Sequence, residues 1–481
     1  MSVDSSSLQQ VLSSPLPELV FARLQQGFAS GRTRPIAWRA EKLRLLEEGL
    51  RARESDLQSA LTADLEKPEF ESFLSEFAIL CEELREARRE LARWAAPKRL
   101  ATPLKLWPAR CEWTYEPKGA VCIIAPWNYP IQLALAPLIA AIAAGNTVCV
   151  KMSDFAPASA RFVHALIREI FADDEVIVVE GDGPWTSQLL DRPWAHVFFT
   201  GSTAVGKAVA QVCARHLTPT TLELGGKSPC IVDATTNLEV AARRAAWGRF
   251  FNAGQTCVAP DYILVEDQVA EAFTRLLIKE VRSRGESAGD SARLIHHKHA
   301  ERLRTLLKGC EILTGGAPSA GTDPRRWPPT LVRVPEDAIV RKHALLHEEI
   351  FGPIFPILNW STREELRSHL ARNPDPLACY VFSEDQSFVA WLLEGATGKV
   401  HPNFSFGFGG GVLNDVMAQF GSPELPFGGR GASGMGAYHG EFGYMEFSQR
   451  RTWVVRRTWG DLALRYPPYS NAWKRWKAWL A

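Results

Sequence analysis

Nine cysteines are spread along the 481-residue chain, and one of them stands in a context that could make it reactive. Cys257 lies in the run FFNAGQTCVAP, after a segment with the apolar spacing of a helix. Asn252, Gly254 and Gln255 interrupt this pattern just before the thiol, which predicts an irregular, exposed presentation. Most single cysteines are inert core residues, so a nucleophilic role also requires a base and donors for an oxyanion.

Glu223 and Asn128 are the candidates for these two roles. Glu223 ends a short predicted strand in TLELGGKSP, where the two following glycines would permit a cleft and leave the carboxylate mobile. Asn128 lies in APWNYP, where the flanking Pro126 and Pro130 would hold its amide in a rigid loop. Each residue has a simpler interpretation, Glu223 as a surface strand end and Asn128 as a turn residue.

The run HVFFTGSTAVGKAVAQ could bind a phosphate. Gly201 directly follows a predicted strand, Ser202 offers a hydroxyl, and Gly206 falls in the first turn of a helix, whose N-terminus favours an anion. The run matches neither the Walker loop nor the Rossmann fingerprint, so a plain strand–turn–helix junction is supported equally well.

Lys151 follows the predicted strand 147–150, at the carboxyl end where open α/β sheets bind ligands. It could donate to ribose hydroxyls, and Asp154 could accept from them. A solvated strand end is the alternative.

The elements that must position these residues alternate between strands and helices. Residues 17–97 have helical patterns and 108–118 an extended one. From residue 120 onwards, strands at 148–150, 176–180 and 196–200 alternate with helices at 156–172 and 204–216, and a second set has strands at 230–233 and 262–266 around a helix at 238–251. This alternation predicts an α/β fold with two parallel-sheet domains and a cleft between them.

Composition excludes several classes of protein. The formal net charge is +1, whereas a nucleic-acid binder usually carries a basic excess. The odd cysteine count without a CxxC pair indicates a reducing compartment, and the N-terminus lacks a secretory signal, so we expect a cytoplasmic protein. The longest apolar stretch, 133–144, falls short of the roughly 20 residues of a membrane span and predicts a buried core helix.

Six motifs in this order resemble the aldehyde dehydrogenase superfamily: PWNYP, FTGSTAVGK, LELGGKSP, GQTC, EEIFGP and LPFGGRGASGMGAYHG. LNDVMAQF at 413–420, YHG at 438–440 and RYPPY at 465–469 are similar to the class 3 branch, which includes fatty-, aromatic- and coniferyl-aldehyde dehydrogenases.

The resemblance implies the roles of individual residues. Cys257 would be the nucleophile and Glu223 the general base, with the Asn128 amide and the Cys257 N–H as the oxyanion hole. The implied NAD site, with NADP as the alternative, consists of Trp127, Lys151, Asp154, Gly201, Ser202, Gly206, Glu349 and Phe351. Where the family has KPSE, this chain has KMSD at 151–154. Asp154 is one methylene shorter than the family's glutamate, so its hydrogen bonds to the ribose hydroxyls, and with them the preference for NAD or NADP, are left open. Arg430 in LPFGGRG has no interpretation from the sequence.

The implied architecture has two Rossmann-like parallel-sheet domains and a small β bridging arm that pairs subunits into a homodimer. The cofactor domain would comprise 1–103 and 119–224, and the catalytic domain 225–420. The arm and C-terminal segment would comprise 104–118 and 421–481, with the arm's second strand near 446–457.

The implied activity is NAD(P)-dependent oxidation of an aldehyde to its carboxylic acid, through a thiohemiacetal and a thioester on the cysteine that water hydrolyses. Rival hypotheses are an enzyme that releases the thioester to coenzyme A, a non-catalytic structural protein of the same fold, and a cysteine hydrolase. Phe404, Phe406 and Phe408 in the expected substrate loop favour a long-chain aliphatic or aromatic aldehyde.

Two remaining clusters carry weaker hypotheses. Trp473, Trp476 and Trp479 lie among basic residues near the C-terminus and could touch a membrane surface, although packing at the dimer edge is favoured. The group His296, His297 and His299 could suggest a metal. It lies at a charged helix start that we expect to be solvated, without acidic or cysteine partners in sequence, so we expect no metal there.

Overall fold

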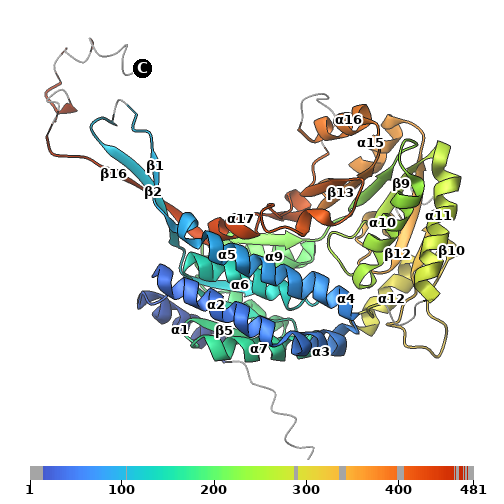
Figure 1. The fold of residues 1–481 in the computed structure, drawn as a ribbon, viewed down its shortest axis with the longest axis horizontal. Helices are drawn as coiled ribbons and strands as arrows, with labels where there is room; N and C mark the ends of the chain where they lie inside the picture. Colours follow the sequence, from blue (N-terminus) through green and yellow to red (C-terminus); the bar gives the residue numbers. More distant parts are fainter. Residues whose placement is uncertain are drawn as a thin grey trace, which may run out of the picture.

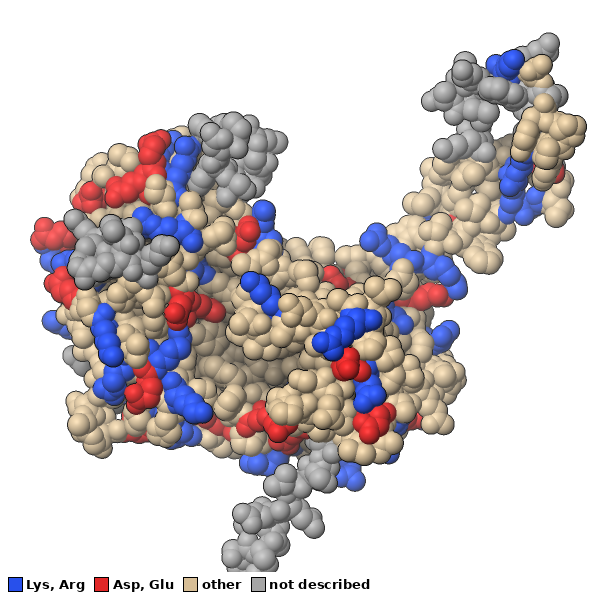
Figure 2. All heavy atoms as spheres, turned by 180° about the vertical axis from the view of Figure 1, so that it is seen from behind, with Lys and Arg blue, Asp and Glu red and all other residues tan. Residues whose placement is uncertain are grey.

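The computed structural model describes residues 15–103, 106–286, 291–334, 343–397, 406–459, 461, 465–469, 471 and 474. Figure 1 shows two α/β bodies side by side and a β arm that projects from one of them. Lysines, arginines and acidic residues are interspersed over the face seen in Figure 2, without a large patch of one sign. The expected class, an α/β protein with two parallel-rich sheets and a small β arm, is confirmed.

The first body is built on a six-stranded sheet in the order β15-β7-β6-β3-β4-β5, parallel except for β15. Side chains of neighbouring positions point to opposite faces, so Val121 and Ile123 lie under one layer of helices while Cys122 lies under the other. The strands are β3 (Ala120–Ile124), β4 (Thr147–Lys151), β5 (Val176–Val179), β6 (His196–Gly201), β7 (Thr220–Leu224) and β15 (Gly434–Met435).

One face of this sheet is covered by α6 (Gln132–Ala144) and α7 (Pro157–Ile170), and the other by α1 (Pro17–Ala29), α8 (Gly183–Leu190) and α9 (Thr203–Ala214). Every residue of α6 is buried, because the N-terminal helices form a further layer over it; the predicted core helix is therefore confirmed. That layer consists of α2 (Ile36–Ala52), α3 (Glu54–Leu65), α4 (Glu69–Ser72), the π-helix η2 (Phe73–Ala78) and α5 (Ile79–Ala95). Among the described residues no helix is both long and apolar enough to cross a membrane.

The second body is built on a seven-stranded sheet in the order β10-β11-β12-β9-β8-β13-β14, in which only β10 runs antiparallel. Its strands are β8 (Pro229–Val232), β9 (Tyr262–Glu266), β10 (Glu311–Thr314), β11 (Thr330–Arg333), β12 (Ile354–Trp360), β13 (Ala378–Phe382) and β14 (Gly410–Leu413). Its helices are α10 (Leu238–Phe250), α11 (Asp267–Glu286), α12 (His297–Leu306), α14 (Ala344–His347), α15 (Arg363–Ala371) and α16 (Gln386–Thr397). The 3₁₀ turn η4 (Phe251–Gly254) follows α10.

The arm is an antiparallel sheet of β1 (Lys98–Leu100), β2 (Arg110–Pro117) and β16 (Ser448–Val455), with β2 in the middle (Figure 1). The predicted extended segment and the strand near 446–457 are confirmed as β2 and β16. Between the second body and β16 lie η5 (Ala418–Phe420), η6 (Gly431–Ser433), β15 and α17 (Gly440–Glu446). Because β15 pairs with β7 and α17 packs on α6, this part of 421–481 joins the first body instead of the arm.

Candidate active site

Two cavities meet at Cys257 and Glu223. A wide cavity lies at the carboxyl ends of β6 and β7 and is lined by Trp127, Asn128, Gly201, Ser202, Glu349 and Phe351, among others. A narrow, mainly apolar cavity lies on the other side and is lined by Tyr129, Leu133, Val258, Leu377, Phe420, Phe427 and Tyr438, among others. Cys257, Glu223, Leu224 and Thr200 line both, so the thiol and the carboxyl group stand where the two spaces join.

The thiol is presented by an irregular turn, as predicted. Asn252 and Ala253 both adopt a φ of +52°, in the left-handed region that side chains rarely occupy, and Gly254 follows at +71°. A Cβ at Gly254 would lie 2.5 Å from the carbonyl oxygen of Gly352, so only glycine fits there. Cys257 itself is partly exposed, whereas seven of the other eight cysteines are buried.

The Cys257 thiol is held in its neutral form at rest. Burial, together with the Glu349 and Glu223 carboxyl groups, raises its pKa to about 12, although the backbone N–H groups of Cys257 and Val258 act in the opposite direction. A thiolate is needed for attack, so a proton must leave this site when a substrate reacts.

Glu223 is a buried carboxyl group on β7, next to Gly434 of β15, and only 3% of its surface is exposed. The alternative of a surface strand end is therefore wrong. Neither of its carboxylate oxygens has a hydrogen-bond partner. Burial raises the pKa of Glu223 well above its usual range, and the Glu446 carboxylate adds to the rise. A buried carboxyl group without hydrogen-bond partners, in a cavity wall beside a thiol, is placed to exchange a proton with a reactant bound there.

Both glycines after Glu223 contribute to the place of Glu349, Gly225 by leaving room for its side chain and Gly226 by donating its N–H to it. A Cβ at Gly225 would lie 1.9 Å from Glu349 Oε2, and the Gly226 N–H donates to the same carboxylate. Burial and the nearby Asp261 raise the pKa of Glu349 to about 8, while its Oε1 is buried without a partner. An unsatisfied acceptor in a cavity wall is suited to a ligand hydroxyl.

Asn128 is buried and lines the wide cavity together with Cys257. Its Nδ2 donates to the carbonyl oxygen of Gln255 at 2.9 Å, which leaves the second amide hydrogen for a ligand.

The expected phosphate turn lies at the start of α9. Gly201 and Ser202 line the wide cavity, and the Ser202 hydroxyl caps the helix by accepting from the Val205 N–H. Gly206 permits close packing on Leu224, because a Cβ there would lie 2.5 Å from Leu224 Cδ2 and the Leu224 side chain would have to shift. Lys151 and Asp154 form an ion pair of 3.1 Å at the end of β4, and these two residues and Gly206 lie outside the lining of the wide cavity.

Sequence reasoning missed how Phe351 is held. Phe351 has a φ of +51°, and His299 of α12 contacts its carbonyl oxygen at 2.6 Å. His299 is 8% exposed and burial lowers its pKa to about 4, so the expectation of a solvated histidine was wrong. One turn further along α12, Arg302 donates to the Glu349 carbonyl oxygen. The spacing of His299 and Arg302 on one helix face was the only signal. Among the described residues no group of three His, Cys, Asp or Glu side chains could hold a metal ion.

Two of the three phenylalanines expected around the substrate, Phe406 and Phe408, line neither cavity. Phe406 is 1% exposed and packs with Phe408 in the core of the second body, and Phe404 lies outside the described residues. Arg430 pairs with Asp375 at 2.9 Å and so ties the segment after η5 to the second body. The C-terminal tryptophans 473, 476 and 479 also lie outside the described residues.

Comparison with known proteins agrees with this geometry. The sequence model of the aldehyde dehydrogenase family matches residues 18–453. The chain is 41% identical to the 4,4'-diaponeurosporen-aldehyde dehydrogenase of Staphylococcus aureus over 94% of this chain and 96% of that protein. It is 37% identical to aldehyde dehydrogenase family 3 member A2 of Mus musculus, over 94% of this chain and 92% of that protein. A solved structure of Staphylococcus aureus AldH in a substrate-bound state superimposes with a TM-score of 0.89 at 39% identity, covering 97% of this chain and all of that one.

The chain belongs to the aldehyde dehydrogenase family. Within the family it falls in the class 3 branch, as the sequence predicted, and it oxidises an aldehyde to a carboxylic acid with NAD or NADP as the cofactor.

Proposed function

We propose that Cys257 is the nucleophile, that Glu223 is the general base, and that the Asn128 amide and the Cys257 N–H stabilise the oxyanion. The observation that carries this assignment is the position of Cys257 and Glu223 in the walls of both cavities. The wide cavity is the cofactor side and the narrow one the substrate side, so the two reactants meet over the thiol.

In this mechanism the Cys257 sulfur, once deprotonated, attacks the aldehyde carbon and forms a thiohemiacetal. The oxygen that becomes negative faces the free hydrogen of Asn128 Nδ2, which stabilises the developing charge. Loss of a hydride from the same carbon, for which a bound nicotinamide would be the acceptor, leaves a thioester on Cys257. Glu223 then takes a proton from water, the hydroxide adds to the thioester carbon, and the acid leaves as the Cys257 thiolate is restored.

We assign eight residues to the cofactor. Glu349, with its unpartnered buried Oε1, would hold the nicotinamide ribose, and Phe351 and Trp127 would pack against the ring. Gly201 and Ser202 at the α9 N-terminus, with Gly206 behind them, would form the pyrophosphate turn. Lys151 and Asp154 would bind the adenosine ribose, with NAD preferred and NADP as the alternative.

The substrate we propose is a long-chain aliphatic or aromatic aldehyde. The narrow cavity offers apolar side chains next to the thiol, among them Leu133, Leu377, Phe420 and Phe427. Burial of alkyl or aryl groups against an apolar lining is favourable. A substrate hydroxyl or carboxylate would lose its hydrogen bonds to water there without gaining others, which is unfavourable.

The test is cofactor reduction, followed at 340 nm, across a panel of aldehydes with NAD and with NADP. We expect kcat/KM for decanal and benzaldehyde to exceed that for glycolaldehyde and succinic semialdehyde by ~10-fold or more. The reverse order would contradict the substrate assignment. Acid release without an added thiol would separate this function from the coenzyme A-acylating alternative, which the presence of Glu223 already disfavours.

We further propose a homodimer that forms through the arm. The strand β16 is an edge of the arm sheet, and Trp453, Val454 and Val455 on it are 58%, 47% and 37% exposed. Apolar side chains on an unpaired edge favour association with another chain.

Trp453→Lys with Val455→Lys should therefore reduce the molar mass in sedimentation equilibrium from that of a dimer to that of a monomer, because two charges would have to be buried. Leu217→Lys is the matched control, since Leu217 is 90% exposed on the first body and should leave the mass unchanged. A dimer that survives the double substitution would refute this interface.

Two proposals concern the whole chain. We place the protein in the cytoplasm, because all nine cysteines are free. We also propose a division into three parts. The cofactor domain comprises 1–103 without β1, 119–224, β15 and α17, and the catalytic domain comprises 225–420. The arm and C-terminal segment comprise β1, 104–118 and the remainder of 421–481.

A further inference from the structure

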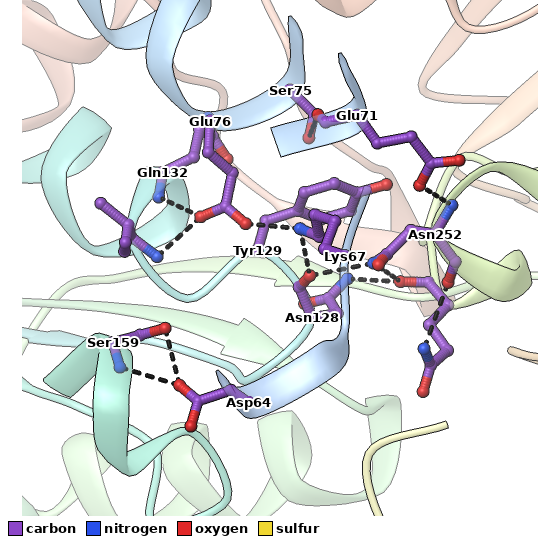
Figure 3. Close-up of polar contacts among 12 residues, drawn as sticks. Asp64, Lys67, Glu71, Ser75, Glu76, Asn128, Tyr129, Gln132, Ser159 and Asn252 are labelled. Atoms are coloured by element: carbon purple, nitrogen blue, oxygen red, sulfur yellow. Dashed lines mark hydrogen bonds and ion pairs between the residues drawn. The ribbon is translucent and has the colours of Figure 1, made fainter. Parts of the chain in front are cut away.

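Two charged side chains are completely buried beneath the Asn128 loop. Lys67 lies in the link between α3 and α4, and Glu76 lies in the π-helix η2; both side chains are 0% exposed, and they form an ion pair. Figure 3 shows this pair between the N-terminal helices and the loop that carries Asn128. Burying two charges is unfavourable unless every partner is well placed, so the contacts of this pair indicate what it holds.

The contacts of Lys67 lead to Asn128. Besides Glu76, the Lys67 ammonium donates to the main-chain carbonyl oxygen of Asn128 at 3.2 Å and lies 4.2 Å from the centre of the Tyr129 ring. The cation thus fixes the backbone of Asn128, which lines the wide cavity together with Cys257.

The contacts of Glu76 fix the other end of the same loop. Its second oxygen accepts from the N–H groups of Ile131 and Gln132, at 2.9 and 3.1 Å, where α6 begins. A carboxylate at a helix N-terminus is well placed electrostatically, so the loop is held both at Asn128 and at its exit.

The loop is also tied to the turn that presents the thiol. Asn252 Nδ2 donates to the same Asn128 carbonyl oxygen at 2.9 Å, and Asn128 Nδ2 donates to the Gln255 carbonyl oxygen. The Asn252 N–H in turn donates to Glu71 of α4 at 2.8 Å, a contact drawn in Figure 3. The N-terminal helices, the Asn128 loop and the thiol turn therefore form one hydrogen-bonded unit.

We propose that Lys67 is a positioning residue that sets the direction of the Asn128 amide toward the substrate oxyanion, with Glu76 as its counter-charge. This inference rests on the oxyanion role proposed for Asn128. An apolar side chain at position 67 would leave the Asn128 carbonyl oxygen with Asn252 as its single donor, and the loop could then shift relative to the thiol. A displacement of the amide by about 1 Å is enough to cost ~100-fold in rate.

The test is a double-mutant cycle between Lys67→Met/Glu76→Gln and Asn128→Ala. The paired substitution removes both charges at once, so that neither is left buried alone. The readouts are kcat and KM for the aldehyde, the Kd for NAD by tryptophan fluorescence, and the thermal midpoint. Lys42→Met is the matched control, because Lys42 also contacts a glutamate, a carbonyl oxygen and an aromatic face (Glu175, Ile170 and Phe171), away from the cavities.

We expect Lys67→Met/Glu76→Gln to lower kcat for the aldehyde ~10- to 100-fold with an unchanged Kd for NAD, and Asn128→Ala to lower it ~100- to 1000-fold. The variant that combines all three substitutions should have a kcat within ~3-fold of that of Asn128→Ala alone, because the amide through which Lys67 acts is already missing in Asn128→Ala. Lys42→Met should keep the wild-type kcat.

Either of two results would overturn the role of Lys67 and leave the proposed function intact. In the first, the losses of kcat caused by Lys67→Met/Glu76→Gln and by Asn128→Ala multiply in the combined variant. In the second, Lys67→Met/Glu76→Gln keeps the wild-type kcat while Asn128→Ala is strongly impaired. Wild-type kcat in Asn128→Ala would overturn both. If Lys67→Met/Glu76→Gln melts below the assay temperature, Asn252→Gly takes its place in the cycle, because it removes the other donor to the same carbonyl oxygen and tolerates the positive φ. Multiplicative effects in that cycle would equally overturn the proposal.

Discussion

Cys257→Ala should lower aldehyde-dependent cofactor reduction by ~10⁴-fold or more, because the variant has no nucleophile to form the thiohemiacetal. The substitution removes one sulfur atom from a partly exposed position between two cavities, so the fold and the affinity for NAD should be preserved. Initial rates at 340 nm with decanal, together with a fluorescence titration of NAD, measure both quantities.

Cys310→Ala is the matched control. Cys310 is also half-buried, and burial also raises the pKa of its thiol, but it lies between α12 and β10, outside the lining of both cavities. Its loss should leave the rate unchanged. Turnover by Cys257→Ala at more than a hundredth of the wild-type rate would show that another group attacks the aldehyde.

Glu223→Gln should separate the two halves of the reaction. Without a base to activate water the thioester persists, so steady-state acid formation should fall ~100- to 1000-fold. The first turnover does not need this water, so a stopped-flow burst of reduced cofactor equal to the number of active sites should remain. Loss of the burst would mean that Glu223 also takes the proton of the Cys257 thiol, and an unchanged steady state would exclude it as the base.

The pH dependence follows from the environment of Glu223. Burial and the Glu446 carboxylate raise the pKa of Glu223. As the pH falls, the carboxylate form that acts as a base is therefore protonated at a pH well above the usual titration range of a glutamate. The rate of thioester hydrolysis should therefore rise with pH through this raised pKa in the wild type. In Glu223→Gln this rise should be absent, and a retained rise would assign it to another group.

The sequence predicted the parts of the site that depend on local patterns. Strand–helix alternation gave both parallel sheets, and the motifs around Cys257, Glu223 and Glu349 led to residues that the fold brings to one cavity. These residues stand at strand ends and turns, where the order of elements in an α/β sheet dictates proximity.

The parts of the site that the sequence did not predict depend on which residues are buried in the folded protein, and local sequence patterns do not reveal this. Lys67, Glu76 and His299 belong to residue types that are usually exposed, so a charged stretch such as LEKPEF indicates a surface. The positions of Lys67 and Glu76 become interior because the N-terminal helices pack on α6. His299 is buried elsewhere, where α12 lies against Phe351 and Trp127. The same applies to Phe406, whose aromatic neighbours indicated a substrate loop and which packs in a core.

The hydrogen bonds that join the Asn128 loop to the thiol turn have a consequence for how the protein is made. The contact of Asn128 with Gln255 spans 127 residues, and that of Asn252 with Glu71 spans 181. Contacts between such distant positions form late, because the chain between them must be ordered first. On the ribosome, Cys257 therefore gains these surroundings only after the chain has been made past the thiol turn, long after the N-terminal helices and the Asn128 loop that hold this turn.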